Sequence, residues 1–139
     1  MTERDAKREA VRSWWTKAND SLAAAQRELA AGALAFAINR AYYALFYAVT
    51  ALFLEEGREF SKHAGVRAAF NQAVIKAGRL EKQYGELYNT LFADREAADY
   101  VAFMEFNPSD VAEKVAKCEK FLSAIRPLIK ALEEDATSP

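Results

Sequence analysis

The feature that most constrains the fold is a long apolar run from Ala33 to Leu54, in which Arg40 is the only formally charged residue. Asn39 and Thr50 are its only other clearly polar residues apart from three tyrosines. A helix that is apolar around most of its circumference lies either in a protein core or in a bilayer. The arginine, the asparagine and the tyrosines favour the central helix of a helical bundle over a membrane span.

Arg40 needs an explanation, because an unpaired buried guanidinium costs several kcal/mol. Residues three and four apart share a helix face, which places Phe36, Arg40, Tyr43 and Tyr47 on one stripe. A later helix offers a matching stripe of Tyr88, Phe92, Arg95 and Asp99. In one interpretation Asp99 pairs with Arg40 and forms a polar seam beneath Arg95, with Tyr43 alongside. In the other, the arginine lays its stem along the core and extends its head group into water. We predict the ion pair.

Apolar residues with helical spacing predict four further helices, and no segment alternates as a strand would. These helices cover about residues 11–31, 61–77, 80–100 and 108–132. We expect Ser61 and Asn107 to cap the helices that follow them, and Gly85 to mark close packing or a break. Pro127 lies within a continuing apolar stripe, which predicts a kink rather than an end. The chain is therefore expected to be a single all-α domain, residues 1–139, a bundle of four to five antiparallel helices with its core over about 10–132 and frayed ends.

The composition excludes several classes of function. A net charge of −1 over 139 residues argues against a protein that coats nucleic acid electrostatically, and leaves room only for a local basic patch. One cysteine and one histidine allow no intramolecular disulfide and do not suit a zinc site, so we expect no metal and no cofactor. The charged N-terminus lacks the apolar core of a signal peptide, which predicts a cytoplasmic protein that does not bind membranes.

Three segments together resemble the HEPN domain (higher eukaryotes and prokaryotes nucleotide-binding), in particular its small stand-alone prokaryotic members. They are NRAYYALFYAVTALFLEEG, SKHAGVRAAF and YGELYNTLFADREAADY. The resemblance extends from about Trp14 to Arg126. It implies a bundle of four to five helices that often dimerises and that often pairs with a minimal nucleotidyltransferase in toxin–antitoxin modules. In active members it also implies metal-independent cleavage of RNA.

Active members of that family carry an arginine followed, after four to six residues, by a histidine on the same helix. Arg95 matches the arginine, but Asp99 and Tyr100 stand where the histidine is expected. Histidine titrates near neutral pH without help, whereas an aspartate paired with arginine is a poor acid and a weak base. His63 is the only histidine and the alternative catalyst, although a lone histidine near a helix start is more often a cap or a packed polar contact.

Two groups of residues have both a structural and a functional interpretation. Basic residues around the third helix form either a solvated face or a patch that binds phosphate: Arg58, Lys62, Arg67, Lys76, Arg79 and Lys82. Tyr42, Phe46 and Phe53 recur at helical spacing, and we expect them in the core rather than on a base-stacking platform.

Three functions remain open from the sequence. The first is a module, of the kind found in toxin–antitoxin systems, that binds a nucleotide, RNA or a nucleotidyltransferase partner through the polar seam and its surroundings: Arg40, Tyr43, Tyr47, Tyr100, Lys62 and Arg67. The second is a metal-independent endoribonuclease that uses Arg95 with His63 or Asp99. The third is a purely structural partner subunit.

The sequence also predicts a homodimer. Trp14 and Trp15 are adjacent on one helix and cannot both face inward, and the run from Ala33 to Leu54 has more apolar circumference than one small bundle covers. Light scattering at micromolar concentration should give twice the chain mass of 15.5 kDa. A stable particle of the single-chain mass would contradict this prediction.

Overall fold

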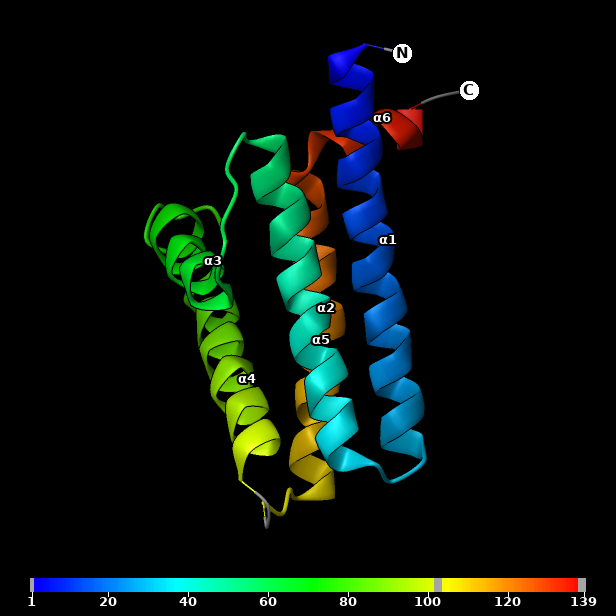
Figure 1. Cartoon of the computed structure of the whole chain (residues 1–139), viewed down its shortest axis with the longest axis vertical. Coiled ribbons are helices and arrows are strands. Elements are labelled where there is room, and N and C mark those ends of the chain that lie inside the picture. The colour runs from blue at the N-terminus through cyan, green and yellow to red at the C-terminus, as the bar shows by residue number, and fades with distance from the viewer. Residues whose placement is uncertain (1, 102–103, 138–139) are drawn as a thin grey trace.

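The computed structural model describes residues 2–101 and 104–137, and this part of the chain contains six α-helices and no strand (Figure 1). The helices are α1 (Glu3–Ala30), α2 (Leu34–Glu55), α3 (His63–Phe70), α4 (Lys82–Tyr100), α5 (Pro108–Ile125) and α6 (Lys130–Thr137). A π-helical turn, Asn71–Ile75, extends α3, and a 3-10 turn, Arg126–Leu128, follows α5. The predicted all-α bundle is confirmed.

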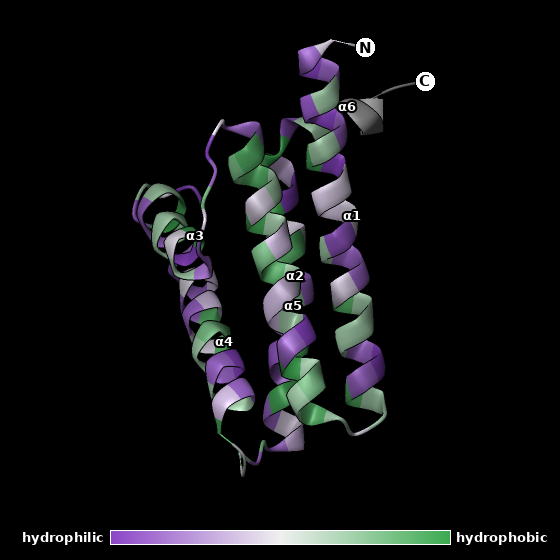
Figure 2. Ribbon diagram, in the orientation of Figure 1, coloured by the Kyte–Doolittle hydropathy of each residue, from purple (hydrophilic) through white to green (hydrophobic). Residues whose placement is uncertain are grey.

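The four long helices lie side by side, and successive long helices run in opposite directions (Figure 1). Helix α2 is central and packs against α1, α4 and α5. By length and composition alone α2 could cross a membrane, but 61% of its most apolar window is buried in the bundle. Figure 2 shows hydrophobic residues along most of α2 and hydrophilic residues over much of α1 and α4. Burial of α2 by its neighbours is therefore the main source of the core.

Of the two helix caps predicted from the sequence, Asn107 is confirmed and Ser61 is wrong. Asn107 precedes α5, and its side-chain oxygen accepts a hydrogen bond from the Asp110 amide at 3.1 Å, as predicted. Thr2 and Asp5 form a capping box that starts α1 at Glu3. Ser61 is not the cap of α3, because Lys62 occupies that position and makes no side-chain capping bond.

The kink predicted at Pro127 is wrong, because α5 ends at Ile125 and the chain turns before α6 begins. The Glu55 carboxylate of α2 accepts hydrogen bonds from the amides of Lys130 and Ala131, both at 2.8 Å. These bonds satisfy two of the amides that a helix start leaves without partners, so a new helix is stabilised after the proline. Ile129 is buried although it lies beyond the end of α5, so the apolar spacing continues past the helix.

Gly85 is a point of close packing between α4 and the π-helical turn, and it does not break the helix. A methyl group added there would lie 2.7 Å from Asn71 Oδ1 and 3.0 Å from Ile75 Cγ1. Asn71 is itself held, since its amide donates to the Arg67 carbonyl at 3.1 Å and to Asn89 Oδ1 at 2.9 Å. The absence of a side chain at Gly85 therefore sets how closely α4 approaches the end of α3.

The substitution Gly85→Ala should destabilise the protein by about 1–2 kcal/mol although alanine is the better helix former, because the methyl group overpacks this contact. The measurement is the free energy of unfolding in urea. Gly65→Ala in α3 is the matched control, since the added methyl group would meet only Phe60 Cδ1 at 3.5 Å. The control should be neutral or stabilising by up to about 1 kcal/mol. Equal effects of the two substitutions would show that the contact at Gly85 is not tight.

Candidate functional site

Aromatic side chains from four helices form one continuous, partly exposed surface along α2. Tyr43 and Phe46 lie at its centre, with ring centroids 6.0 Å apart. Tyr47 joins them to Trp14 of α1, at 5.6 Å. On the other side are rings from α3 and α4. We refer to the whole set as the aromatic face: Trp14, Tyr42, Tyr43, Phe46, Tyr47, His63 and Phe92. Tyr42 is buried beneath this face and the other members are partly buried, so Phe46 is not the fully buried core residue that the sequence predicts.

Each of the helices that build the aromatic face also places a cation against one of its rings. Lys17 Nζ of α1 lies 4.8 Å from the Trp14 centroid. The guanidinium carbons of three arginines lie over rings in the same way: Arg40 of α2 at 5.0 Å from Tyr43, Arg67 of α3 at 4.5 Å from Phe92 and Arg95 of α4 at 4.9 Å from Tyr42. At these distances the cations are attracted by the ring faces. The surface is thus both aromatic and positively charged.

The predicted ion pair between Arg40 and Asp99 is wrong. Arg40 donates from Nε and Nη2 to Asn39 Oδ1, at 3.0 and 2.7 Å. Asp99 instead accepts from Arg95 Nη1 at 3.2 Å, one turn back on its own helix. The physical reason is that Arg40 lies on the outward stripe of α2 and is only partly buried, so it needs no ionic partner.

Three buried donors within the aromatic face and the cations against it have no hydrogen-bond partner among the described residues: the Tyr42 hydroxyl, Arg67 Nε and Arg95 Nε. Elsewhere on the two guanidinium groups, Arg67 Nη1 donates to Asn89 Oδ1 at 3.2 Å and Arg95 Nη1 donates to Asp99. Burial raises the pKa of Tyr42 to about 12, so its hydroxyl is protonated at neutral pH. Two cations and a neutral donor in one place can bind an anion.

His63 lies within the aromatic face, where it begins α3. Its ring centroid is 4.4 Å from Phe46, 5.6 Å from Tyr43 and 5.9 Å from Tyr42. Burial, and then the charge of Arg95, lower the pKa of His63. The imidazole is therefore neutral at pH 7 and able to accept a proton. The structure brings together His63 and Arg95, which lie far apart in the sequence.

Two of the candidate residues lie apart from the aromatic face. Tyr100 ends α4 and is 83% exposed, with no ring contact to the face among the described residues. Lys62 is exposed at the start of α3. The sequence did not point to Lys17, which lies over Trp14, or to Asn39 and Asn89, which accept hydrogen bonds from Arg40 and Arg67. Only Lys17 had a signal, because it lies three residues after Trp14 and so shares its helix face.

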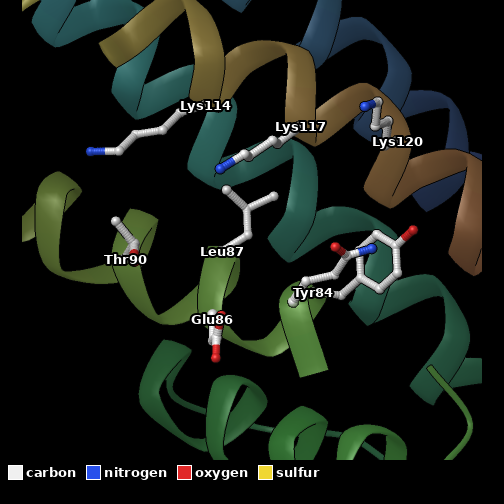
Figure 3. Close-up of a pocket in the computed structure, with 8 residues that line it drawn as sticks. Tyr84, Glu86, Leu87, Thr90, Lys114, Lys117 and Lys120 are labelled. Atoms are coloured by element: carbon white, nitrogen blue, oxygen red, sulfur yellow. The ribbon is translucent and has the colours of Figure 1, made fainter. Parts of the chain in front are cut away.

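A concavity of about 350 Å³ lies between α4 and α5, away from the aromatic face. Figure 3 shows Lys114, Lys117 and Lys120 of α5 opposite Tyr84, Leu87 and Thr90 of α4. Lys114 Nζ is 2.6 Å from Asp94 and 2.9 Å from Asp110, and Lys117 Nζ is 3.0 Å from Glu113. Because acids of the chain pair with Lys114 and Lys117, two of the three lysines, the groove is a weaker anion site than the aromatic face.

The chain is thus a small bundle of long helices, and its central helix carries a cationic, aromatic surface. The family model described as "HEPN domain" matches residues 11–128. The chain is 42% identical over 127 residues to a UPF0332 protein of Thermotoga maritima, covering 91% of this chain and 96% of the relative. It is 33% identical over 107 residues to a Methanocaldococcus jannaschii protein named "Putative toxin", covering 77% of this chain and 73% of the relative. The chain therefore belongs to the HEPN domain family.

Arg40→Met should cost less than about 1 kcal/mol, because the side chain has a neutral partner and reaches water. Combined with Asp99→Asn, its effect on the free energy of unfolding should be additive, since the two residues do not touch. Urea unfolding of both single variants and the double variant measures this. A coupling energy above about 1 kcal/mol would show that Arg40 and Asp99 interact, as the sequence predicted, and would contradict the structure.

The pKa of His63 should lie below its ordinary value of about 6.5 and should rise in Arg95→Met, because that substitution removes a nearby positive charge. Since His63 is the only histidine, its ring protons can be followed without ambiguity in an NMR titration. Arg27→Met, in the last turn of α1, is the control and should leave the titration unchanged. An unchanged midpoint in Arg95→Met would show that Arg95 does not act on His63.

Proposed function

We propose that the aromatic face binds single-stranded RNA. The observation that carries the proposal is the group of three unpartnered donors, on Tyr42, Arg67 and Arg95, that lie in contact with rings of the aromatic face. Arginine binds phosphate through charged hydrogen bonds, and aromatic rings stack on unpaired bases. The donors would then hold a phosphate while Tyr43 and Tyr47 contact the adjoining bases.

The charge distribution supports a local site of this kind. The whole chain carries a net charge of −1. The aromatic face, in contrast, gathers four cations, Lys17, Arg40, Arg67 and Arg95, and in the described part of the chain Asp99 is the acid that pairs with one of them. Such a patch favours a short stretch of phosphates over extended coating of a duplex. Relatives named as toxins are in keeping with a protein that acts on a cellular polymer.

Fluorescence anisotropy with a short labelled RNA tests the proposal. Arg67→Met and Arg95→Met should each weaken binding about tenfold and reduce the salt dependence of the affinity, because each removes a phosphate contact. Arg27→Met removes an equal charge outside the face and should have little effect. Equal weakening by all three variants would point to a general charge effect and would contradict a site at the aromatic face.

A second candidate function is cleavage of the bound RNA, and the contact of a neutral His63 with the ring cluster under Arg95 favours it. His63 would take the proton of a 2′-hydroxyl, whose oxygen attacks the adjacent phosphorus and forms a 2′,3′-cyclic phosphate, while Arg95 stabilises the charge on the phosphate. The bond to the 5′-oxygen breaks, and that oxygen takes a proton from water to leave as a 5′-hydroxyl. Asp99, the other candidate base, instead accepts a hydrogen bond from Arg95 Nη1 at 3.2 Å.

Incubation of the purified protein with total RNA and EDTA tests cleavage. Fragments should form with the unmodified protein and disappear in both Arg95→Ala and His63→Gln. Cleavage by His63→Gln would show that His63 is not the base. If the RNA stays intact even with the unmodified protein, cleavage is excluded and binding alone is the proposed function.

We also propose that the protein forms a homodimer and binds a nucleotidyltransferase partner. Large apolar side chains are exposed at the end of the bundle where α2 begins and α4 ends: Phe36 is 68%, Tyr100 83% and Val101 51% exposed. An exposed group of this kind is typical of a protein-binding surface. This surface would also serve a purely structural subunit, the third function that the sequence leaves open.

A further inference from the structure

A groove of about 300 Å³ lies beside the aromatic face, between α1, the C-terminal half of α2, the linker to α3 and α3 itself. Its lining is mostly aromatic and aliphatic, with polar groups at the rim: Trp14, Phe46, Thr50, Phe53, Leu54, Arg58, Glu59, Phe60 and Val66. The groove is distinct from the concavity between α4 and α5.

The groove continues the aromatic face without a break. Trp14 and Phe46 belong to both surfaces, and Phe46 separates the groove from His63. Thr50 follows Tyr47 on the outward stripe of α2, three residues on, and Leu54 follows Thr50 by four. From Arg40 to Leu54 the stripe is about 21 Å long. A strand that lies along α2 would pass from the cations to the groove.

The chemistry of the groove suits a flat aromatic ligand. Phe53 forms a buried wall and Phe60, 37% exposed, stands at the rim, with ring centroids 5.4 Å apart. The Arg58 guanidinium covers both rings, at 5.1 Å from Phe53 and 5.4 Å from Phe60. Proteins recognise unstacked RNA bases with such aromatic rings and arginine planes.

Acceptor groups lie where the polar edge of a base would need them. Thr50 lines the groove, and its hydroxyl donates to the Phe46 carbonyl at 2.7 Å, which leaves the lone pairs of its oxygen able to accept a hydrogen bond. Glu59 supplies a carboxylate at the rim. Base N–H groups can donate to both, whereas a purely apolar side chain would gain no hydrogen bond from either.

We propose that this groove receives one unpaired nucleobase of the RNA whose phosphate is held by Arg67 and Arg95. The inference rests on the proposed function and narrows its substrate to RNA with at least one base that can leave the stack. A duplex, whose bases are paired and stacked, does not fit the groove.

The experiment uses the full chain and a labelled RNA pentamer, in which each position in turn carries an abasic sugar. Loss of the base at one position should weaken binding about tenfold, the effect of one stacked base. In Phe60→Ala the intact pentamer should bind about tenfold more weakly, and the abasic substitution at that position should have no further effect. Met104→Ala, a truncation of another partly exposed apolar side chain, is the matched control and should bind as the unmodified protein does.

The outcomes separate this inference from the function on which it rests. If the unmodified protein binds no RNA, both are overturned. If it binds RNA and Arg67→Met weakens that binding, but Phe60→Ala does not, only the nucleobase site is overturned. If the abasic substitutions weaken binding equally in the unmodified protein and in Phe60→Ala, the nucleobase site is also overturned, because no base then occupies the groove. Bases that contact Tyr43 or Tyr47 would also respond to the abasic scan, so a second groove variant is needed. Arg58→Met removes the guanidinium over both rings and should abolish the abasic effect at the same position as Phe60→Ala, so a folding defect in one variant cannot obscure the result.

Discussion

The rest of the structure depends on the burial of α2. Its apolar circumference must be covered on most sides, and α1, α4 and α5 supply the cover. Coverage by three helices leaves one stripe outward, and Arg40 and the half-exposed tyrosines of α2 lie on it. The exposed stripe is thus the remainder of an otherwise buried helix. A functional surface built there is rigid, because its backbone belongs to the centre of the core.

Arg40 illustrates how this arrangement tolerates charge within an apolar segment. The residue occupies the stripe that packing leaves open, stacks on Tyr43 and bonds the neighbouring Asn39. Every interaction it makes through its side chain is with residues of α2 itself, so the charge is accommodated before any other helix packs. Arg67 and Arg95 differ, since each lies over a ring of another helix and gains its position only from the tertiary structure.

Features that depend on local rules were predictable from the sequence, whereas features that depend on packing between helices were not. Helical periodicity located α2, and side-chain chemistry located the Asn107 cap. The break after Ile125 was missed because it depends on Glu55, which is distant in sequence and supplies the cap of α6. Phase along α4 placed Arg95 and Asp99 on one face correctly but could not say that they bond each other. The proximity of His63 to Arg95, and the groove around Phe60, result from where α3 lies against α2, which no spacing in the chain reveals.

The four cations of the aromatic face come from four different helices, and this has a consequence during synthesis of the chain. Helices α1, α2 and α3 leave the ribosome first, but Arg95 is among the last residues of α4. The surface that holds Arg95 in place also requires α5 to close the core around α2. A nascent or partly folded chain therefore displays separate charges but no assembled site. The assembled surface therefore exists only in molecules that have completed folding, and a chain degraded before that point never displays it.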